Sequence, residues 1–289
     1  MNKNLKITFL SILAILLLAF MTIVIIDKDG NIFNVFAYSN ELIFEKEYNG
    51  ANVKNLDIIS DTSNIIIKKN ESNVIKVSIY GRKNDDYKVE IKDDYLYIDN
   101  DKKINFCIGF CPNTKIEVLL PEKEYNKLKI KTISGDIDTS NISSNDITVS
   151  STSGEIKINK SSTAAIKTIS GDIVFIELND AEISTTSGEI KGDTVDKITA
   201  KTISGDIEIS KINKYCQMTT TSGEITISSL TLEKDSLLKS ISGDIKISKA
   251  NSIYVDTSTI SGDIDVDNDR HAKYELKIKT TSGDINVSK

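Results

Sequence analysis

Lys131-Thr132-Ile133-Ser134-Gly135-Asp136-Ile137 decides the fold, because near-copies of this stretch recur to the C-terminus. A repeat period of 17 to 21 residues is typical of a solenoid, in which each repeat forms one coil and stacks on its neighbours. Nine glycines mark the copies: Gly135, Gly154, Gly171, Gly188, Gly205, Gly223, Gly243, Gly262 and Gly283.

Each copy carries an apolar pattern with a period of two on both sides of its glycine. The positions seven and five residues before it are mostly apolar, as at Leu128 and Ile130, and the second residue after it is always Ile. This pattern predicts β-strands, and its phase slips by one residue at Ser-Gly, so the chain turns a corner there with the backbone freedom of glycine. Stacked copies would place isoleucine on isoleucine, with parallel strands about 4.8 Å apart. The predicted fold class is therefore all-β, a parallel β-helix of about nine coils over residues 128–289.

A second period lies above the first. Copies with Ile-Ser-Gly-Asp, as at Ile133 and Ile169, alternate with copies that read Thr-Ser-Gly-Glu, as at Thr152. Lysine stands four residues before the glycine only in the Ile copies, until the last two copies break the alternation. Relief of repulsion between lysines on adjacent coils and duplication of a two-coil unit both explain the pattern.

Residues 50–127 differ in composition from the repeats. They hold both prolines and five of the ten tyrosines, and short polar turns separate their strand-like segments. Because a solenoid exposes an unpaired sheet edge at its end, we expect this part to form irregular first coils that also cap the repeats. The expected strands are Leu56–Ser60, Asn64–Ile67, Val74–Tyr80, Tyr87–Ile91, Tyr95–Ile98 and Lys115–Leu120.

An uncharged apolar run covers residues 7–26. Twenty helical residues extend about 30 Å, enough to span a membrane. Lysines precede the run and aspartates follow it, so the positive-inside rule places residues 1–6 in the cytoplasm and the C-terminal part outside. Residues 27–49 would then form a linker.

A cleaved signal peptide is the competing interpretation of this N-terminus. Val35-Phe36-Ala37 ends in a small residue of the kind that a signal peptidase accepts at its cleavage site. The apolar run is longer than a usual signal-peptide core, and eleven residues separate it from the end of Ala37, which favours an uncleaved single-pass anchor. Both interpretations export the remaining chain.

The charge pattern argues against a nucleic-acid partner. The 42 acidic and 36 basic residues are scattered along the chain, give a net charge of -6 and form no basic stretch. The expected partners are the membrane, through the N-terminal helix, and an envelope protein or polysaccharide. The sequence leaves the oligomeric state open.

The cysteines indicate no metal centre. Cys107 and Cys111 lie four residues apart, and outside the cytoplasm they could form a disulfide. A zinc site would need further ligands, and the only histidine, His271, is far along the chain. Cys216 falls on a core position of its repeat.

One carboxylate follows each corner glycine, so the coils would align these residues in a column. A calcium ladder is one interpretation, because close carboxylates repel unless a cation lies between them. The other interpretation is that these carboxylates are solvated turn residues. The modest glycine and aspartate content of each repeat favours this second interpretation. The column comprises Asp136, Glu155, Asp172, Glu189, Asp206, Glu224, Asp244, Asp263 and Asp284.

No catalytic arrangement stands out. Paired carboxylates could serve a glycosidase, but here they are evenly repeated, and His271 lies in a charged loop. Few aromatic residues in the repeats could stack on sugars: Phe175, Tyr215, Tyr254 and Tyr274. We therefore expect a non-enzymatic protein and assign no catalytic, cofactor-binding or metal residue.

The repeats, together with Ile116–Pro121 leading into Leu128–Asp136, resemble the bacterial putative-adhesin domain family, which includes LiaG-like envelope-stress proteins. The similarity covers about residues 50 to 289 and rests on an "lP…l.v.t.sGdi" signature. It implies a β-helix on the cell surface, often behind a membrane anchor, and no catalytic residue transfers from it. The leading hypothesis is an anchored extracytoplasmic interaction scaffold. A polysaccharide-active enzyme and an accessory protein of a membrane stress-sensing system are the alternatives.

Overall fold

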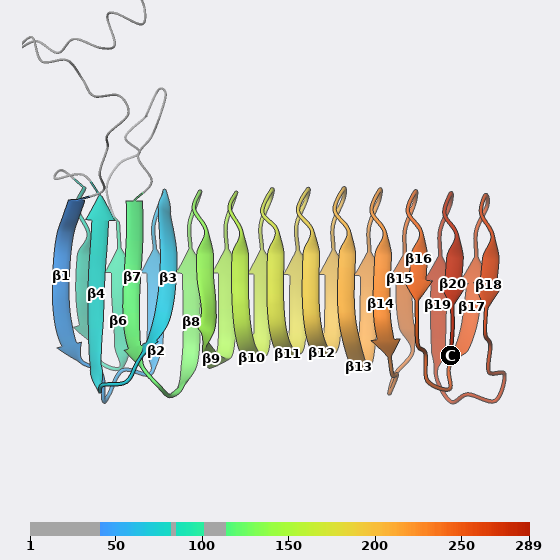
Figure 1. The fold of residues 1–289 in the computed structure, drawn as a ribbon, viewed down its shortest axis with the longest axis horizontal. Coiled ribbons are helices and arrows are strands. Elements are labelled where there is room, and N and C mark those ends of the chain that lie inside the picture. Colours follow the sequence, from blue (N-terminus) through green and yellow to red (C-terminus); the bar gives the residue numbers. More distant parts are fainter. Residues whose placement is uncertain (1–40, 82–84, 101–113) are drawn as a thin grey trace, which may run out of the picture. The chain divides into compact units, whose positions relative to one another are not determined.

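The computed structural model describes residues 41–81, 85–100 and 114–289, and residues 41 to 289 form one compact unit. All regular elements of these residues are β-strands, which join in one continuous sheet (Figure 1). None of the described residues forms a helix able to cross a membrane. The predicted anchor at 7–26 and the pair Cys107 and Cys111 lie outside the described residues.

The repeats form parallel coils, as predicted. The strands pair in register, so that Ile156 of one coil lies beside Ile137 of the preceding coil and Ile173 of the following one. Each of the longer strands bends and contributes to two faces of the solenoid, one following a corner glycine and one preceding the next. These longer strands are β9 (Ile137–Ser150), β10 (Ile156–Lys167), β11 (Ile173–Ser184), β12 (Ile190–Lys201) and β13 (Ile207–Thr219), and the shorter β14 (Ile225–Leu230) follows them.

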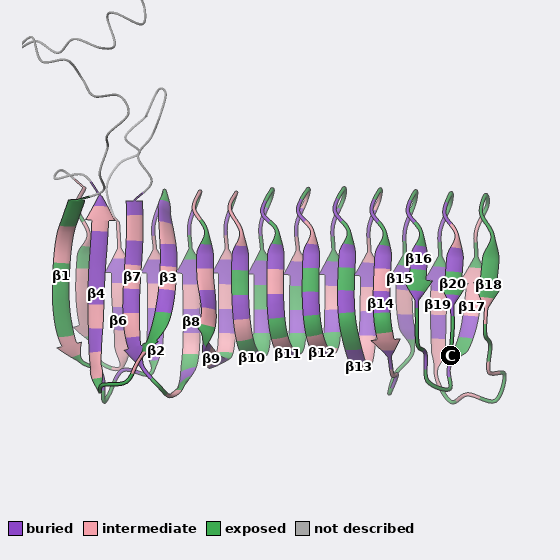
Figure 2. Cartoon of the chain, viewed as in Figure 1, coloured by how far each residue is buried: buried purple, intermediate pink, exposed green. Residues whose placement is uncertain are grey.

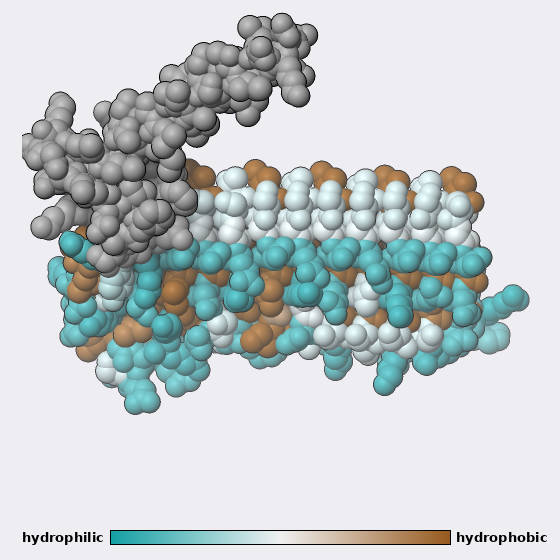
Figure 3. All heavy atoms as spheres, turned by 45° about the horizontal axis from the view of Figure 1, so that its top comes forward, coloured by the Kyte–Doolittle hydropathy of each residue, from teal (hydrophilic) through white to brown (hydrophobic). Residues whose placement is uncertain are grey.

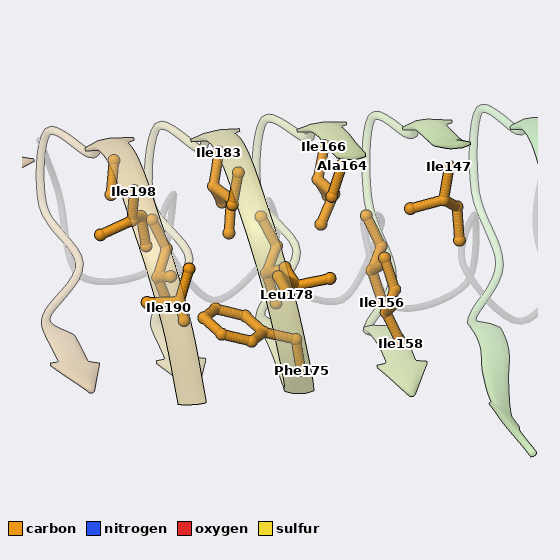
Figure 4. Packing of buried hydrophobic residues seen from close by; sticks show 14 of the residues in the cluster. Ile147, Ile156, Ile158, Ala164, Ile166, Phe175, Leu178, Ile183, Ile190 and Ile198 are labelled. Carbon is orange, nitrogen blue, oxygen red and sulfur yellow. The ribbon is translucent and has the colours of Figure 1, made fainter. Parts of the chain in front are cut away.

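A narrow apolar core runs through the stacked coils. Eight of the nine isoleucines that lie two residues after a corner glycine are at most 1% exposed, and the ninth is Ile264. Buried positions align from coil to coil as stripes across the strands (Figure 2), and a close view shows side chains of successive coils in two rows (Figure 4). The predicted stacking of isoleucine on isoleucine is confirmed.

The N-terminal part forms the predicted strands and a cap. Its elements are β1 (Glu41–Asn49), β2 (Asn55–Ile59), β3 (Ser63–Asn70), β4 (Val74–Gly81), β5 (Lys88–Lys92), β6 (Tyr95–Asp99), β7 (Thr114–Pro121) and β8 (Glu124–Lys131). Strand β1 pairs antiparallel with β4, β4 with β7, and β5 with β6. Antiparallel strands therefore form the N-terminal edge of the sheet on both faces of the solenoid. Strand β1 lies within the segment 27–49 that the sequence assigns to a linker, so ordered structure begins before residue 50.

The spatial order of the coils departs from the sequence order at both ends. At the N-terminal end, β2 pairs with both β6 and β8, and β3 pairs with both β7 and β9. The first coil of the sequence, β2 with β3, therefore lies between the second coil, β6 with β7, and the third coil, β8 with β9. We expected consecutive repeats to stack in order, and this expectation is wrong for these coils.

The C-terminal end shows the same exchange. The last three coils use β15 (Ser236–Lys239) with β16 (Ile245–Ile247), β17 (Tyr254–Ser258) with β18 (Ile264–Val266), and β19 (Glu275–Lys279) with β20 (Ile285–Val287). Strand β19 pairs with both β15 and β17, and β20 pairs with both β16 and β18. The final coil is thus inserted between its two predecessors, which leaves the coil of Gly262 outermost. Ile264 is 47% exposed because no coil covers it.

Candidate functional site

The corner glycines lie directly against one another. A Cβ atom built on Gly188 or Gly205 would lie 1.8 Å from the carbonyl oxygen of the glycine one coil earlier, so no other residue fits. Among the nine corner glycines, only Gly135 and Gly154 have positive φ, at 134° and 106°. Backbone freedom, the reason predicted from the sequence, therefore applies at the first two corners, and close approach of the coils requires glycine at the others.

A buried hydroxyl holds each later corner in place. At Thr202, Oγ1 accepts a hydrogen bond from the Gly205 amide at 3.1 Å and donates one to the Gly188 carbonyl at 3.4 Å. The same arrangement recurs along the solenoid at Thr185, Thr220 and Ser240. Thr or Ser therefore stands three residues before the glycine because its hydroxyl binds the glycine amide of its own coil and the glycine carbonyl of the preceding coil.

The aspartates of the carboxylate column bind backbone amides. Asp136 Oδ1 accepts the amide of Glu155 at 2.9 Å, and Asp172 and Asp206 make the same bond to the next coil. The last three coils carry aspartates at this position and make the same bond: Asp244 accepts the amide of Asp284, and Asp284 accepts the amide of Asp263. This role favours turn residues over a calcium ladder. No group of three His, Cys, Asp or Glu within the described ranges is placed to hold a metal ion.

Lysines next to the column partly balance its charge. Glu155 pairs with Lys157 at 2.6 Å, and Glu189 pairs with Lys191 at 2.9 Å. The hydrogen bond that each lysine donates to its glutamate raises the pKa of the lysine, so both lysines stay charged at neutral pH. The column is thus a regular acidic stripe with an ion pair at these two coils.

A row of Ile and Thr side chains, exposed or half-buried, runs beside this stripe, and we call it the corner ridge. Its residues stand two positions before each corner glycine. Four isoleucines of the ridge are 43% to 51% exposed, and Ile260 on the outermost coil is 84% exposed. Apolar patches recur at intervals along one edge, and a hydrophilic band lies below them (Figure 3). In spatial order the ridge reads Ile133, Thr152, Ile169, Thr186, Ile203, Thr221, Ile241, Thr281 and Ile260.

A groove opens where the repeat becomes irregular. Strand β13 carries one extra residue opposite β12, which forms a bulge at Asn213 and Lys214. Asp196 accepts hydrogen bonds from both side chains, at 3.0 Å and 2.7 Å. Beyond β14 the chain forms a loop at residues 231–235 before β15 begins. The loop stays hydrogen-bonded to the bulged coil, because the Thr231 amide donates to the Ile212 carbonyl and the Glu233 amide donates to the Lys214 carbonyl, each at 2.8 Å.

The groove combines an aromatic ring with lysines. Its volume is about 380 Å³, and Lys234 Nζ lies 4.9 Å from the centre of the Tyr215 ring. The Lys197–Asp180 pair spans 3.8 Å, and hydrogen bonding to Asp196 raises the pKa of Lys214. The lining residues are Asp180, Lys197, Ile198, Thr199, Lys214, Tyr215, Glu233 and Lys234.

The other residues singled out from the sequence lie apart from the groove. His271 is exposed in the loop after β18, where its amide donates to Asp269 Oδ1 at 3.0 Å. Cys216 is buried in the core, and desolvation raises the pKa of its thiol to about 12, so it behaves as a small apolar residue. Tyr254 lies on the outermost coil and is 40% exposed.

Sequence reasoning missed the groove and the exchanged coils, although both leave a signal. The glycine interval lengthens from 17 to 18 and then 20 residues around Gly223, which marks the bulge and the loop. The broken alternation of the last two copies marks the exchanged coil.

Comparison with known proteins agrees with the β-solenoid fold. The family profile of the Toastrack DUF4097 domain matches residues 53–211 and again 176–289. The chain belongs to the Toastrack DUF4097 family. No curated protein matches it. The resemblance to putative-adhesin β-helix proteins is confirmed for the whole Toastrack region.

Solved structures show the same fold as this Toastrack chain. A protein described as a putative adhesin from Parabacteroides distasonis aligns with a TM-score of 0.53 and 14% identity, over 86% of this chain and 98% of its own. A second protein of that organism, described as a putative lipid binding protein, aligns with a TM-score of 0.51 and 16% identity, over 85% and 96%. At these identities the likeness concerns the fold.

Proposed function

We propose that this Toastrack protein is an extracytoplasmic interaction scaffold, held at the membrane by residues 7–26, that binds an anionic polysaccharide of the cell envelope in the groove beside Tyr215. The apolar length and flanking charges of the N-terminus support the anchor. The groove is the observation that carries the binding role.

The chemistry of the groove suits a charged sugar. Tyrosine offers a flat apolar ring and a hydroxyl at one edge, which fits the amphipathic faces of a sugar. Three lysines line the groove, and their ammonium groups could bind carboxylate or phosphate groups of a glycan in place of the carboxylates of Asp180, Asp196 and Glu233. Its volume of about 380 Å³ lies within the range of about 300–1,000 Å³ for ligand sites. Repeated coils would let a long polymer continue along the solenoid beyond this groove.

Binding to immobilised full-length protein in detergent tests the proposal. Polygalacturonate serves as the anionic probe, and neutral dextran of matched length serves as its control. We expect Tyr215→Ala to weaken polygalacturonate binding about two- to tenfold, because aromatic contacts contribute about 0.5–1.5 kcal/mol. Tyr254→Ala is the matched control on an exposed tyrosine elsewhere. Equal binding of dextran, or no effect of Tyr215→Ala, would contradict the proposal.

The two alternatives make different predictions. A polysaccharide-active enzyme would release reducing ends or unsaturated sugars from envelope polysaccharide, so absence of turnover across a broad substrate panel would remove it. An accessory protein of a stress-sensing system would change the response of its reporter genes when deleted. We expect the deletion strain to lose polysaccharide binding while that response stays intact.

A further inference from the structure

Isoleucine and threonine alternate strictly along the corner ridge of the folded protein, although they do not alternate strictly along the sequence. Along the chain, Ile241, Ile260 and Thr281 follow one another and break the alternation. In space, the coil of Thr281 lies between the other two: the Thr281 amide donates to the Ile241 carbonyl, and the Ile260 amide donates to the Thr281 carbonyl. The exchange of coils thus restores strict alternation over all nine corners.

Duplication of a two-coil unit does not account for this pattern. Duplication would also keep the neighbouring columns alternating, yet Lys239 and Lys279 become neighbours, and so do Asp244 and Asp284. Only the Ile and Thr column keeps its period where the coils are exchanged. Some property of the exposed ridge itself therefore requires isoleucine on every second coil.

Packing within one molecule does not impose the period. In the core, isoleucines stack on every coil, as Ile156, Ile173 and Ile190 do, and all three are fully buried. Isoleucine thus tolerates a spacing of about 4.8 Å. Single exposed apolar residues are ordinary, but five in one line form an extended apolar feature of the kind that marks an interaction site.

A second copy of this chain is the partner that fits the ridge. The ridge has an apolar repeat of about 9.6 Å, twice the strand spacing, and another copy has the same repeat over the same length. A shift of one coil between two facing ridges places each isoleucine of one copy against a threonine of the other. Apolar side chains of both copies would then leave water together.

The charges on the two flanks of the ridge select the orientation. The acidic stripe lies on one flank. Exposed lysines lie on the other: Lys131, Lys167, Lys201, Lys239 and Lys279. When two ridges face each other with their solenoid axes parallel, the lysine flank of each copy opposes the acidic flank of the other, whereas antiparallel axes bring acid against acid.

We therefore infer that two copies pair along their corner ridges with parallel axes. Such pairing goes beyond the proposed function, because it needs no polysaccharide and uses a different edge of the coils from the Tyr215 groove.

Cross-linking of full-length protein in its membrane with a short bismaleimide tests this pairing. The background carries Cys107→Ser and Cys111→Ser, and Cys216 is buried and stays. Ser170→Cys places a thiol beside the ridge residue Ile169, and Ser162→Cys places one at another exposed site on β10. We expect about tenfold more dimer from Ser170→Cys than from Ser162→Cys, equivalent to about 1.4 kcal/mol.

The orientation is tested by mixing two variants. In an antiparallel pair centred on the coil of Gly205, the coil of Gly171 would face that of Gly243, four coils or about 19 Å away along the axis. Ser170→Cys would then cross-link to Ser242→Cys and not to itself. That outcome would overturn the parallel arrangement, while self-cross-linking of Ser170→Cys supports it.

Removal of the isoleucines tests the ridge itself. We expect replacement of its five isoleucines by threonine to lower the Ser170→Cys dimer yield about tenfold. Ile176→Thr is the matched control, because Ile176 is 45% exposed but lies outside the ridge. Equal yields from the ridge variant and the parent, or equal yields at Ser170→Cys and Ser162→Cys, would overturn the inference.

Discussion

At the scale of single residues, the corner combines three requirements that follow from how closely the coils approach. Glycine leaves room for the carbonyl of the neighbouring coil, a buried hydroxyl satisfies the polar groups on both sides, and an aspartate accepts an amide of the next coil. The sequence Thr-x-Ser-Gly-Asp is therefore one hydrogen-bonded unit. Substitutions within it affect two coils at once.

Gly188→Ala tests the close approach. The new Cβ would lie 1.8 Å from the Gly171 carbonyl oxygen, and moving the backbone to relieve the clash would strain both coils. We expect the free energy of unfolding to fall by about 2 kcal/mol or more. Urea unfolding of the full-length protein measures it. The neighbouring exposed variant Ser187→Ala should stay within about 0.5 kcal/mol of the parent, and a harmless Gly188→Ala would contradict the geometry.

Glu117 gives a pH dependence whose sign follows from its partners. It binds Lys68 at 2.8 Å and Lys115 at 3.0 Å, and the hydrogen bond from Lys68 is the main cause that lowers the pKa of this carboxyl below 4.5. Because the pKa is lower in the folded state than in the unfolded state, the ionised carboxyl stabilises the protein at pH values above the unfolded-state pKa. This stabilisation is lost as the pH falls through the folded-state pKa.

We expect acidification below about pH 4.5 to destabilise the parent more than Glu117→Gln. Thermal unfolding of both proteins between neutral and acidic pH measures the difference. Identical pH profiles would show that the two lysines do not stabilise the carboxylate.

At the scale of elements, the exchanged coils secure both ends of the solenoid. The last strands of the chain, β19 and β20, have a hydrogen-bonded neighbour on each side instead of lying at an edge. Terminal segments usually fray unless they are held in a sheet. At the N-terminal end, β2 and β3 are enclosed in the same way, and antiparallel β1 and β5 cover the outer edges.

Two equivalent isoleucines test the exchange. Ile285 is fully buried although it lies four residues before the last residue, Lys289, whereas Ile264 is 47% exposed. We expect Ile285→Ala to cost about 2–5 kcal/mol of unfolding free energy and Ile264→Ala less than half as much. Urea unfolding of both variants decides the order of the coils. The reverse ranking would indicate that the coils stack in sequence order.

At the scale of the whole molecule, the proposed anchor and the solenoid divide the work. The apolar segment 7–26 would hold the chain at the membrane, and the coils would present the Tyr215 groove and the corner ridge outside it. The groove depends on irregularity in the repeat, whereas the ridge depends on its regularity. One solenoid can therefore carry two surfaces that do not compete.

Fractionation of producing cells tests the anchor. We expect the full-length chain to remain with membranes after carbonate extraction, at the mass of 289 residues, because about twenty apolar residues form a stable span. Deletion of residues 7–26 is the control and should leave the protein out of the membrane fraction. A mature protein that begins near residue 38 would instead indicate cleavage after Ala37.

The repeat pattern alone determined the parallel coils, the corner at Ser-Gly and the inward isoleucines, because each of these depends on contacts that recur with the same register in every copy. The six strands expected between residues 56 and 120 are also present. The Tyr215 groove was not predicted, since a one-residue bulge shows its effect only when two neighbouring coils are compared.

Only the tertiary structure decided which coil lies beside which. Gly243, Gly262 and Gly283 have nearly interchangeable surroundings in the sequence, so local preferences permit either order of the last two coils. The inserted order buries Ile285 and gives the chain's last strands partners on both sides, and it restores the alternation of the corner ridge. Local residues thus specify what a coil is, whereas pairing between distant segments specifies where each coil lies.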